Sequence, residues 1–412
     1  MLSQNTIRII KSTVPVLEVH GTAITKRFYQ MLFENHPELL NVFNHANQKQ
    51  GRQQAALANA VYAAALHIDR LETILPAVKQ IAHKHRSLGI RAEQYPIVGK
   101  HLLAAIKDVL GDAATDEIVQ AWAEAYGVIA NVFISVEADM YLQAERQEGG
   151  WAGFREFTVE RIEKESEAIA SFYLVPKDGS AIASFEPGQY VSVRLTVPGS
   201  PYTHIRQYSL SDAPGRSYYR ITVKREDGSE EADGGVVSRF LHEAVKEGDV
   251  LSLSAPAGDF VLDVRDARPV VLLSGGVGLT PMVSMLKTLS ERYPKRQVTF
   301  VHAARYGKLH ALRDEVEAIA RDNPQVGVYW CYSEPTEADR DARAFHKEGF
   351  VDADWLNAVV PNKDAAYYFC GPIPFMAGIN ASLKSLGVPD ADIRYEFFGP
   401  AGKLEAPVAE RV

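Results

Sequence analysis

The sequence predicts a multidomain protein in which an all-α part comes first, an antiparallel β-barrel second and a doubly wound α/β part last. Three observations lead to this fold class. Residues 1–150 hold 4 prolines and 8 glycines, whereas residues 151–412 hold 17 and 21, so turn-forming residues become denser after position 150. The hydrophobic period changes from helical to strand-like at Gly149-Gly150. From Pro269 onward, apolar strands alternate with helices, as in a parallel sheet covered on both faces.

Length and composition narrow the class of protein. The 412 residues are 46% hydrophobic, which is enough to form several domain cores. The net charge of −8, without a basic block, argues against nucleic acid as a partner. No apolar run approaches the ~18 residues of a membrane span, and the N-terminus lacks a basic-then-apolar leader. With only Cys331 and Cys370, we expect a protein of the reducing cytoplasm. We also expect a monomer without obligate membrane association.

The first part is predicted to be helical throughout. Apolar residues at three- and four-residue steps predict a helix after Tyr95-Pro96 that stops at Gly111, and a long amphipathic helix that begins after Thr115. Such a bundle is able to bury a ligand between its helices. The earlier helices are expected at approximately 3–20, 22–34, 51–67 and 71–86.

The second and third parts are predicted from strand patterns. The barrel strands are expected at 154–162, 168–175, 189–197, 206–211, 218–225 and 250–255. The parallel strands are expected at VVLLS, VTFVHAAR, VYWCYS, AYYFC and RYEFF, with helices after the first four. The resulting domain ranges are 1–147, 151–262 and 266–412.

Two glycine-containing turns that precede helices suit phosphate groups. The first is Gly275-Gly276-Val277-Gly278-Leu279-Thr280, between an apolar strand and a helix. Glycines allow close backbone approach, and the free N–H groups at a helix start favour negative charge. By itself this run is equally compatible with an ordinary strand-to-helix turn. The second is Gly234-Gly235-Val236-Val237-Ser238, and the presence of both favours two phosphate-bearing cofactors.

A polar strand between these turns suits a flavin. Arg206-Gln207-Tyr208-Ser209 supplies a planar guanidinium for a diphosphate, a ring that can lie on a flat heterocycle and a hydroxyl for a ring nitrogen. Tyr190 precedes it on the neighbouring predicted strand. Taken singly, Tyr208 would be interpreted as a core aromatic and Arg206 as a solvated charge.

Residues 151–405 resemble the ferredoxin–NADP reductase superfamily. The resemblance rests on the two glycine motifs, the Arg206–Ser209 motif, Cys370-Gly371-Pro372 and Glu396-Phe397-Phe398-Gly399-Pro400, in that order. It implies that Tyr190, Arg206, Tyr208 and Ser209 hold FAD and that the 234–238 loop takes its pyrophosphate. It also implies that the 275–280 loop binds the nicotinamide nucleotide, that Cys370 lies near the nicotinamide and that residues 396–398 close over the flavin.

The helical part contains candidates for a redox centre. This part has seven histidines. His83 and His85 point to different helix faces, so they cannot both bind one metal from a regular helix. A single axial histidine to a haem is therefore the simplest interpretation as a metal site. Glu137 lies on the apolar stripe of the long helix, where a buried carboxylate needs partners. Tyr29 and Gln53 place hydrogen-bonding groups on other helices. Spacing alone is also compatible with partly exposed polar residues at all three positions.

The helical part resembles a bacterial globin, and the whole chain is similar to the flavohaemoglobins. The resemblance rests on Phe28-Tyr29, Pro37, Phe43, Gln53, Leu57, His85, Tyr95 and Glu137, in that order. It implies haem b with His85 as the proximal iron ligand, and Glu137 and Tyr95 as a relay to it. It implies that Tyr29, Gln53 and Leu57 lie on the distal side, that Phe43 packs on the macrocycle and that Lys84 faces the flavin domain.

The resemblance implies a nitric oxide dioxygenase. NAD(P)H would reduce FAD, FAD would reduce haem iron one electron at a time, and haem-bound O2, hydrogen-bonded by Tyr29, would convert NO into nitrate. His302, Arg305 and Tyr306 suit either nucleotide, and NADH is favoured by resemblance alone. Two alternatives remain open: an O2- or NO-binding or sensing globin that its reductase keeps ferrous, and a plain flavin reductase or diaphorase.

Overall fold

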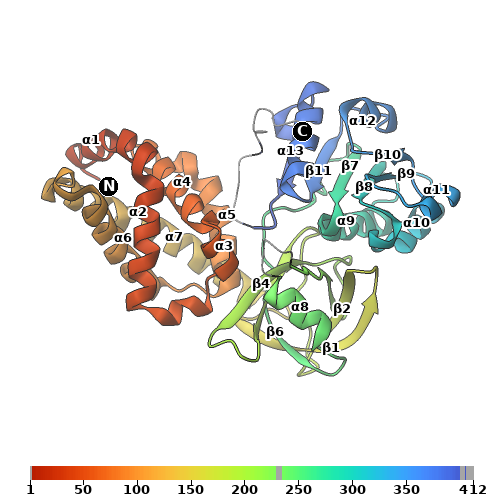
Figure 1. Cartoon of the computed structure of the whole chain (residues 1–412), viewed down its shortest axis with the longest axis horizontal. Coiled ribbons are helices and arrows are strands. Elements are labelled where there is room, and N and C mark those ends of the chain that lie inside the picture. Colours follow the sequence, from red (N-terminus) through yellow and green to blue (C-terminus); the bar gives the residue numbers. More distant parts are fainter. Residues whose placement is uncertain (1, 229–233, 400–403, 405–412) are drawn as a thin grey trace. The chain divides into compact units, whose positions relative to one another are not determined.

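The computed structural model describes residues 2–228, 234–399 and 404 (Figure 1). Contacts within the chain divide it into two compact units. The first consists of Met1–Arg155, Ser192–Arg206 and Ser252–Ala257, and the second of Glu156–Val191, Gln207–Leu251 and Gly258–Val412. The predicted domain ranges 1–147, 151–262 and 266–412 stay predictions.

The N-terminal part is helical, as predicted. Side chains such as Phe28, Leu32, Leu102 and Trp122 are buried between its helices and form one apolar core. Helix α2 packs on α4 and α6, and α5 and α6 pack on α7. The α-helices are α1 (Gln4–Ser12), α2 (Val14–Asn35), α3 (His45–Lys49), α4 (Arg52–Leu66), α5 (Leu75–Leu88), α6 (Tyr95–Leu110) and α7 (Asp116–Arg146). The 3-10 helices are η1 (Pro37–Asn41), η2 (Leu71–Ile74), η3 (Ala92–Gln94) and η4 (Gly111–Ala113).

The first helix break is not where the sequence suggested it. The prediction of helices at 3–20 and 22–34 is wrong, because the chain breaks at Thr13 and then continues in one helix to Asn35. The Thr13 hydroxyl donates to the carbonyl of Ile10, and Pro15, which has no N–H to donate, lies in the first turn of α2. Gly21 instead lies inside α2, where an added Cβ would be 3.5 Å from the Cβ of Ala58.

Helix α7 passes a length and composition test for a membrane span. It is 31 residues long, and it is the one helix of the described chain that does so. Core helices pass the same test, and Trp122, Ala125 and Glu137 of α7 are buried inside the helical part.

The predicted antiparallel β domain is confirmed. Its six-stranded sheet has the order β4-β3-β6-β1-β2-β5, and the pairs β1–β2, β2–β5 and β3–β6 are antiparallel. The strands are β1 (Phe154–Lys164), β2 (Ile169–Pro176), β3 (Tyr190–Thr196), β4 (Thr203–Ser209), β5 (Tyr219–Lys224) and β6 (Val250–Ser254), with α8 (Val236–Glu243) before the last.

The predicted parallel sheet is confirmed as well. Its order is β10-β9-β8-β7-β11-β12, and every pair is parallel. The strands are β7 (Val270–Gly275), β8 (Val298–Ala304), β9 (Val326–Tyr332), β10 (Lys347–Glu348), β11 (Ala366–Cys370) and β12 (Ile393–Glu396). The helices are η5 (Gly276–Gly278), α9 (Leu279–Arg292), η6 (Gly307–Leu309), α10 (Arg313–Asp322), α11 (Glu337–Asp341), α12 (Ala353–Val359), α13 (Ile373–Ser385) and η7 (Asp390–Asp392).

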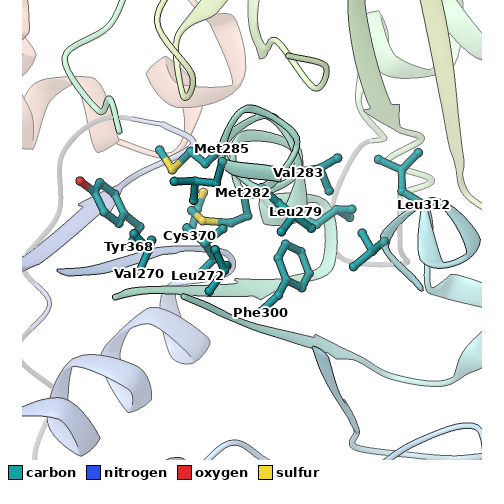
Figure 2. Close-up of a cluster of buried hydrophobic side chains, with 14 of the residues drawn as sticks. Val270, Leu272, Leu279, Met282, Val283, Met285, Phe300, Leu312, Tyr368 and Cys370 are labelled. Carbon is teal, nitrogen blue, oxygen red and sulfur yellow. The ribbon is translucent and has the colours of Figure 1, made fainter. Parts of the chain in front are cut away.

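One face of this sheet packs on α9. Figure 2 shows Leu279, Met282 and Met285 of α9 over side chains of the central strands, among them Leu272, Phe300 and Cys370. The sequence predicted one short helix between β9 and β11, where the structure has two, α11 and α12, and it did not identify β10. Two residues of strand and five or seven of helix are too few for a hydrophobic period to show.

Candidate functional site

Three helices of the first unit bring together the predicted proximal residues. Nδ1 of His85 on α5 lies 2.7 Å from Oε1 of Glu137 on α7. The hydroxyl of Tyr95, at the start of α6, donates to the same oxygen at 2.6 Å and lies 3.2 Å from His85 Nδ1. Glu137 is 3% exposed, so its place on the apolar stripe is a buried one with two partners.

This arrangement leaves His85 with one nitrogen for a metal. A carboxylate oxygen only accepts, so Nδ1 carries the proton that it donates to Glu137, and Nε2 keeps its lone pair. The side chain is 32% exposed and the carboxylate makes the imidazole a stronger donor. Among the described residues, no group of three His, Cys, Asp or Glu could hold a metal ion. These residues therefore fit a haem with a single axial histidine.

A second layer of aromatic residues holds the relay, and the sequence pattern did not identify it as part of the site. The hydroxyl of Tyr126 donates to the carbonyl of Tyr95 at 2.6 Å, and that of Tyr141 donates to Ile90 at 2.6 Å. A Cβ at Gly99 would lie 2.4 Å from the Tyr126 ring. Tyr141 occurs one helical turn after Glu137 on α7, which is the signal that could have identified it.

The predicted distal residues also meet. Tyr29 is 5% exposed and packs edge-on against Phe43 at a centroid distance of 5.6 Å. Burial raises the pKa of the Tyr29 phenol, and a hydrogen bond with the Gln53 side chain lowers it in part. Leu57, one turn after Gln53 on α4, packs against the same core. A neutral phenol at this position is a hydrogen-bond donor at neutral pH.

Two basic residues flank His85 on α5. Lys84 is half-buried, and its predicted position facing the flavin domain stays a prediction. Arg86 is buried and donates to the carbonyl of Pro256, within the first unit. Arg86 was not identified from the sequence, because no local pattern distinguishes a buried arginine from a solvated one.

The predicted FAD residues lie on or beside β4. Arg206, Gln207, Tyr208 and Ser209 form its second half, and Nη1 of Arg206 donates to the Ile205 carbonyl at 2.8 Å. Directly after β4, the Leu210 N–H donates to the Gln189 carbonyl, which brings the start of β3 with Tyr190 next to it.

The 234–238 loop is joined to Glu226 by two hydrogen bonds. The Gly235 N–H donates to the carbonyl of Glu226 at 2.8 Å, and the Ser238 hydroxyl accepts from the Glu226 N–H at 3.2 Å. A Cβ at Gly235 would lie 2.5 Å from the Ser238 oxygen, so only glycine fits. The amides of Val236 and Val237, in the first turn of α8, are the groups that suit a pyrophosphate here.

The 275–280 loop links β7 to α9 through a tight turn. Gly276 has a φ of +53°, and a Cβ at Gly278 would lie 2.2 Å from the Cys370 carbonyl oxygen. The backbone of β11 therefore touches the turn, and Gly371 continues it: a Cβ there would be 3.1 Å from Gly275. Val277, Leu279 and Thr280 complete the loop, whose amides at the start of α9 suit a diphosphate.

The chain near the carboxyl ends of the central strands carries the remaining candidates. Cys370 ends β11 and pairs with Ser274 and Glu396 on its two sides. Its side chain is fully buried, and burial raises the pKa of the thiol well above its usual range. Pro372 caps α13, Phe397 packs against the sheet core and Phe398 is 48% exposed, followed by Gly399. Pro400 lies outside the described residues.

The residues at and after the end of β8 were predicted to meet the adenosine end of the nucleotide, and this position stays a prediction. Nδ1 of His302 lies 2.9 Å from the Ser274 hydroxyl, and its Nε2 is buried without a partner. Arg305, three residues later, donates to the Glu334 carboxylate at 2.8 Å, and both side chains are exposed. The Arg305 guanidinium is thus paired with a carboxylate at the surface.

Three families match the chain in succession. They are globin over residues 26–133, the oxidoreductase FAD-binding domain over 156–262 and the oxidoreductase NAD-binding domain over 272–381. A Flavohemoprotein of Bacillus thuringiensis subsp. konkukian is 60% identical over 405 residues, which cover 98% of this chain and 100% of that protein.

Solved structures agree with these matches. A flavohemoglobin from Malassezia yamatoensis with bound FAD and heme has a TM-score of 0.84 and 26% identity, covering 97% of this chain and 100% of that one. The FAD/NAD-binding domain of a nitric oxide dioxygenase from Vibrio cholerae O1 biovar El Tor has a TM-score of 0.54 and 40% identity. The match covers 60% of this chain and 99% of that one. The chain belongs to the flavohaemoprotein family, as an NAD(P)H-dependent oxidoreductase with a globin part, an FAD-binding part and an NAD-binding part.

Proposed function

We propose that this protein is a nitric oxide dioxygenase that uses haem b, FAD and NAD(P)H to convert NO and O2 into nitrate. The bond between His85 Nδ1 and the Glu137 carboxylate carries the proposal. A carboxylate that accepts from the imidazole increases its electron donation, which favours oxidation chemistry over simple ligand storage. The named activity of the Vibrio cholerae relative supports the same assignment.

The residues on the two sides of the globin part would have different roles. His85 would hold the haem iron, with Glu137 and Tyr95 fixing the orientation and tautomer of its ring. Tyr29, oriented by Gln53, would donate a hydrogen bond to the reacting oxygen, with Phe43 and Leu57 excluding water. When bound, haem supplies a one-electron iron centre and FAD converts the two-electron hydride into single electrons.

The electron count fits this set of cofactors. Each nitrate consumes one NO, one O2 and one electron, so one NAD(P)H supports two nitrates. The 275–280 loop would hold the nicotinamide nucleotide, with Cys370 near its ring and Glu396 to Phe398 near the flavin. The Arg206–Ser209 strand, with Tyr190 and the 234–238 loop, would hold FAD.

The proposal also includes the cellular location, the oligomeric state and the partners of the protein. We place the protein in the cytoplasm as a monomer, with NO and O2 as ligands and no nucleic-acid partner or obligate membrane association. Cys331 and Cys370 support a reducing compartment, because both are free thiols in buried positions.

The decisive experiment measures nitrate. Holoenzyme given NADH, O2 and NO should consume NO catalytically and release nitrate in equal amount. Stable oxygen binding with slow NO turnover would instead indicate a binding or sensing globin. Diaphorase activity without a haem absorption band would indicate a plain flavin reductase.

A further inference from the structure

The loop that follows β4 is bonded to helix α9, and both belong to the second unit. Residues 210–213 of this loop are buried. The Ser284 hydroxyl of α9 donates to the Asp212 carbonyl at 2.8 Å, and Lys287 Nζ lies 2.7 Å from Asp212 Oδ1. Ser284 and Lys287 are three residues apart, so one face of the helix holds the loop.

Four charged side chains, Asp212, Lys287, Glu315 and Arg220, form an ionic ring at this contact. Lys287 Nζ also lies 2.5 Å from Glu315 Oε1 on α10, and Arg220 Nη1 on β5 donates to Glu315 Oε2 at 2.9 Å. Nε of Arg220 donates to the hydroxyl of Ser211, the residue before Asp212, at 3.1 Å. The ionic ring thus joins the antiparallel β domain to two helices of the parallel-sheet part.

The ionic ring is buried and balanced in charge. The side chains of Arg220 and Asp212 are 3% and 4% exposed. Burial raises the pKa of the Asp212 carboxyl, but the charges of Arg220 and Lys287 outweigh it, so the pKa lies below its usual value. Buried ion pairs add little net stability over apolar packing, because the loss of hydration offsets their attraction. Their hydrogen bonds are directional, so the ionic ring contributes a fixed geometry.

This geometry bears on both predicted nucleotide sites. Asp212 comes three residues after Ser209, the last residue of the predicted flavin strand, a reach of at most ~11 Å. Ser284 comes four residues after Thr280 of the 275–280 loop, one helical turn or ~6 Å along α9. A shift of α9 against Asp212 would therefore displace the nicotinamide loop relative to the flavin strand.

We propose that Asp212, Lys287 and Glu315 are positioning residues for hydride transfer, because they hold the nucleotide helix α9 in register with the strand that carries the flavin. The inference rests on the proposed places of FAD and the nicotinamide nucleotide. The step moves one hydride with its electron pair from NADH to FAD, and solvent supplies a proton, so no other reactant is needed. Such a step is sensitive to geometry, since a misplacement of ~1 Å can cost ~100-fold in rate.

Stopped-flow reduction of FAD by NADH, without O2, tests the positioning role in the holoenzyme. Lys287→Met removes the central charge of the ionic ring and keeps an unbranched side chain. The limiting rate of reduction should fall by about 10-fold, while the Kd for NADH from the same data should change by less than about twofold. With NADH deuterated at the transferred hydrogen, the slowed rate should show a primary isotope effect at least as large as in wild type.

Three further variants separate positioning from charge and from folding. Lys287→Arg restores a cation that can bridge both carboxylates and should regain most of the rate. Lys295→Met removes the same charge at an exposed position beyond the end of α9 and should leave the rate unchanged. Ser284→Ala removes one neutral hydrogen bond and should slow reduction by about threefold. It decides the question if Lys287→Met does not retain FAD.

Calorimetric titration of NAD⁺ into the oxidised holoenzyme gives a readout without turnover, and its Kd should be equal in wild type and Lys287→Met. A rise in this Kd that matches the loss of rate overturns the inference, because the ionic ring would then only support nucleotide binding. An unchanged limiting rate in Lys287→Met and Ser284→Ala overturns it as well. So does an equal loss in Lys287→Met and Lys295→Met, which net charge alone would explain.

The inference and the proposed function fail differently. If the enzyme forms nitrate from NO but FAD reduction does not respond to the variants of the ionic ring, the positioning role is wrong and the proposed function stands. If NADH does not reduce FAD in wild type, the proposed electron path is wrong, and the positioning role is wrong with it.

Discussion

His85 and His302 are two histidines with a hydrogen-bonded Nδ1, and they differ in the nearest partner of that nitrogen. In the helical part, Nδ1 of His85 meets the carboxylate of Glu137 at 2.7 Å, and 32% of the side chain is exposed. In the parallel-sheet part, Nδ1 of His302 meets the hydroxyl of Ser274 at 2.9 Å, and the residue is 1% exposed.

The hydrogen-bond partner and the exposure of an imidazole together decide what it can do. A carboxylate that accepts from Nδ1 strengthens donation from the Nε2 lone pair to a metal, and exposure leaves room for a ligand. A hydroxyl and full burial have the opposite effect: burial lowers the pKa of His302 to about 3, so the ring is neutral. Its neighbour His310, at a ring distance of 4.4 Å, is buried as well. We infer that His302 supports the loop after Ser274 and does not touch substrate.

The largest effect is expected from His85→Ala. Because His85 is the proposed single axial ligand, its removal should lower haem retention by about 100-fold or more. Haem and FAD in the purified protein are measured by absorption and by extraction. FAD content should stay at the wild-type level, which shows that the rest of the chain is folded. Normal haem content in the variant would assign the ligand to another residue.

Glu137→Gln removes the negative charge that His85 Nδ1 meets. The amide keeps an acceptor oxygen but loses the charge, so NO turnover should fall by about 10- to 100-fold. Tyr95→Phe removes one of the two hydrogen bonds to Glu137 and should have a smaller effect. Stopped-flow reduction of FAD by NADH is the control and should not change. Equal loss of both steps would indicate a folding defect.

His302 makes the stability of the chain depend on pH. Its folded pKa lies below the value of about 6.5 for an unfolded histidine, so the unfolded state binds the extra proton. The contribution of His302 to the free energy of unfolding is therefore fully present above pH 6.5. It falls as the pH drops toward 3, with a loss of about 2 kcal/mol at pH 5.

Urea unfolding at pH 7 and pH 5 measures this loss. His302→Gln should remove about 2 kcal/mol from the pH-dependent difference, and the remainder comes from other buried histidines such as His310. An unchanged difference in the variant would mean that the native state accommodates a charged His302.

The smallest effect is expected at Arg305, where the same strand reaches the surface. If His302 is structural, contact with the adenosine ribose belongs to residues beyond it. Glu334→Gln should free the Arg305 guanidinium and lower the KM for NADPH by about threefold, because the pair is exposed and weak. The KM for NADH should stay constant. Steady-state cytochrome c reduction measures both, and an unchanged ratio would remove Arg305 from nucleotide selection.

Strand positions were predictable because the signals are local. The apolar runs at β7, β8 and β11 and the glycines of the 275–280 loop lie within a few residues of one another, and the structure confirms the elements they predict. The helix break at Thr13 was not predictable in the same way. Pro15 and Gly21 both suggest an interruption, and only the packing of Gly21 on Ala58 decides between them.

The residue types at the candidate site could be predicted from the sequence, but the partners that they contact could not. The spacing of Glu137 is compatible with an exposed edge or a buried face, and its two partners are 52 and 42 residues away in the chain. The pairing of Arg305 with Glu334 spans 29 residues. Such contacts depend on how the helices or strands pack, and a local period holds no information about that packing.

Gly99 affects the position of Tyr95 through a third residue. Its missing side chain makes room for the Tyr126 ring, and the Tyr126 hydroxyl holds the carbonyl of Tyr95. A random mutagenesis screen for loss of NO turnover should therefore recover inactive clones at Gly99 on α6. To a geneticist that position would look like a catalytic residue, although it bears no functional group.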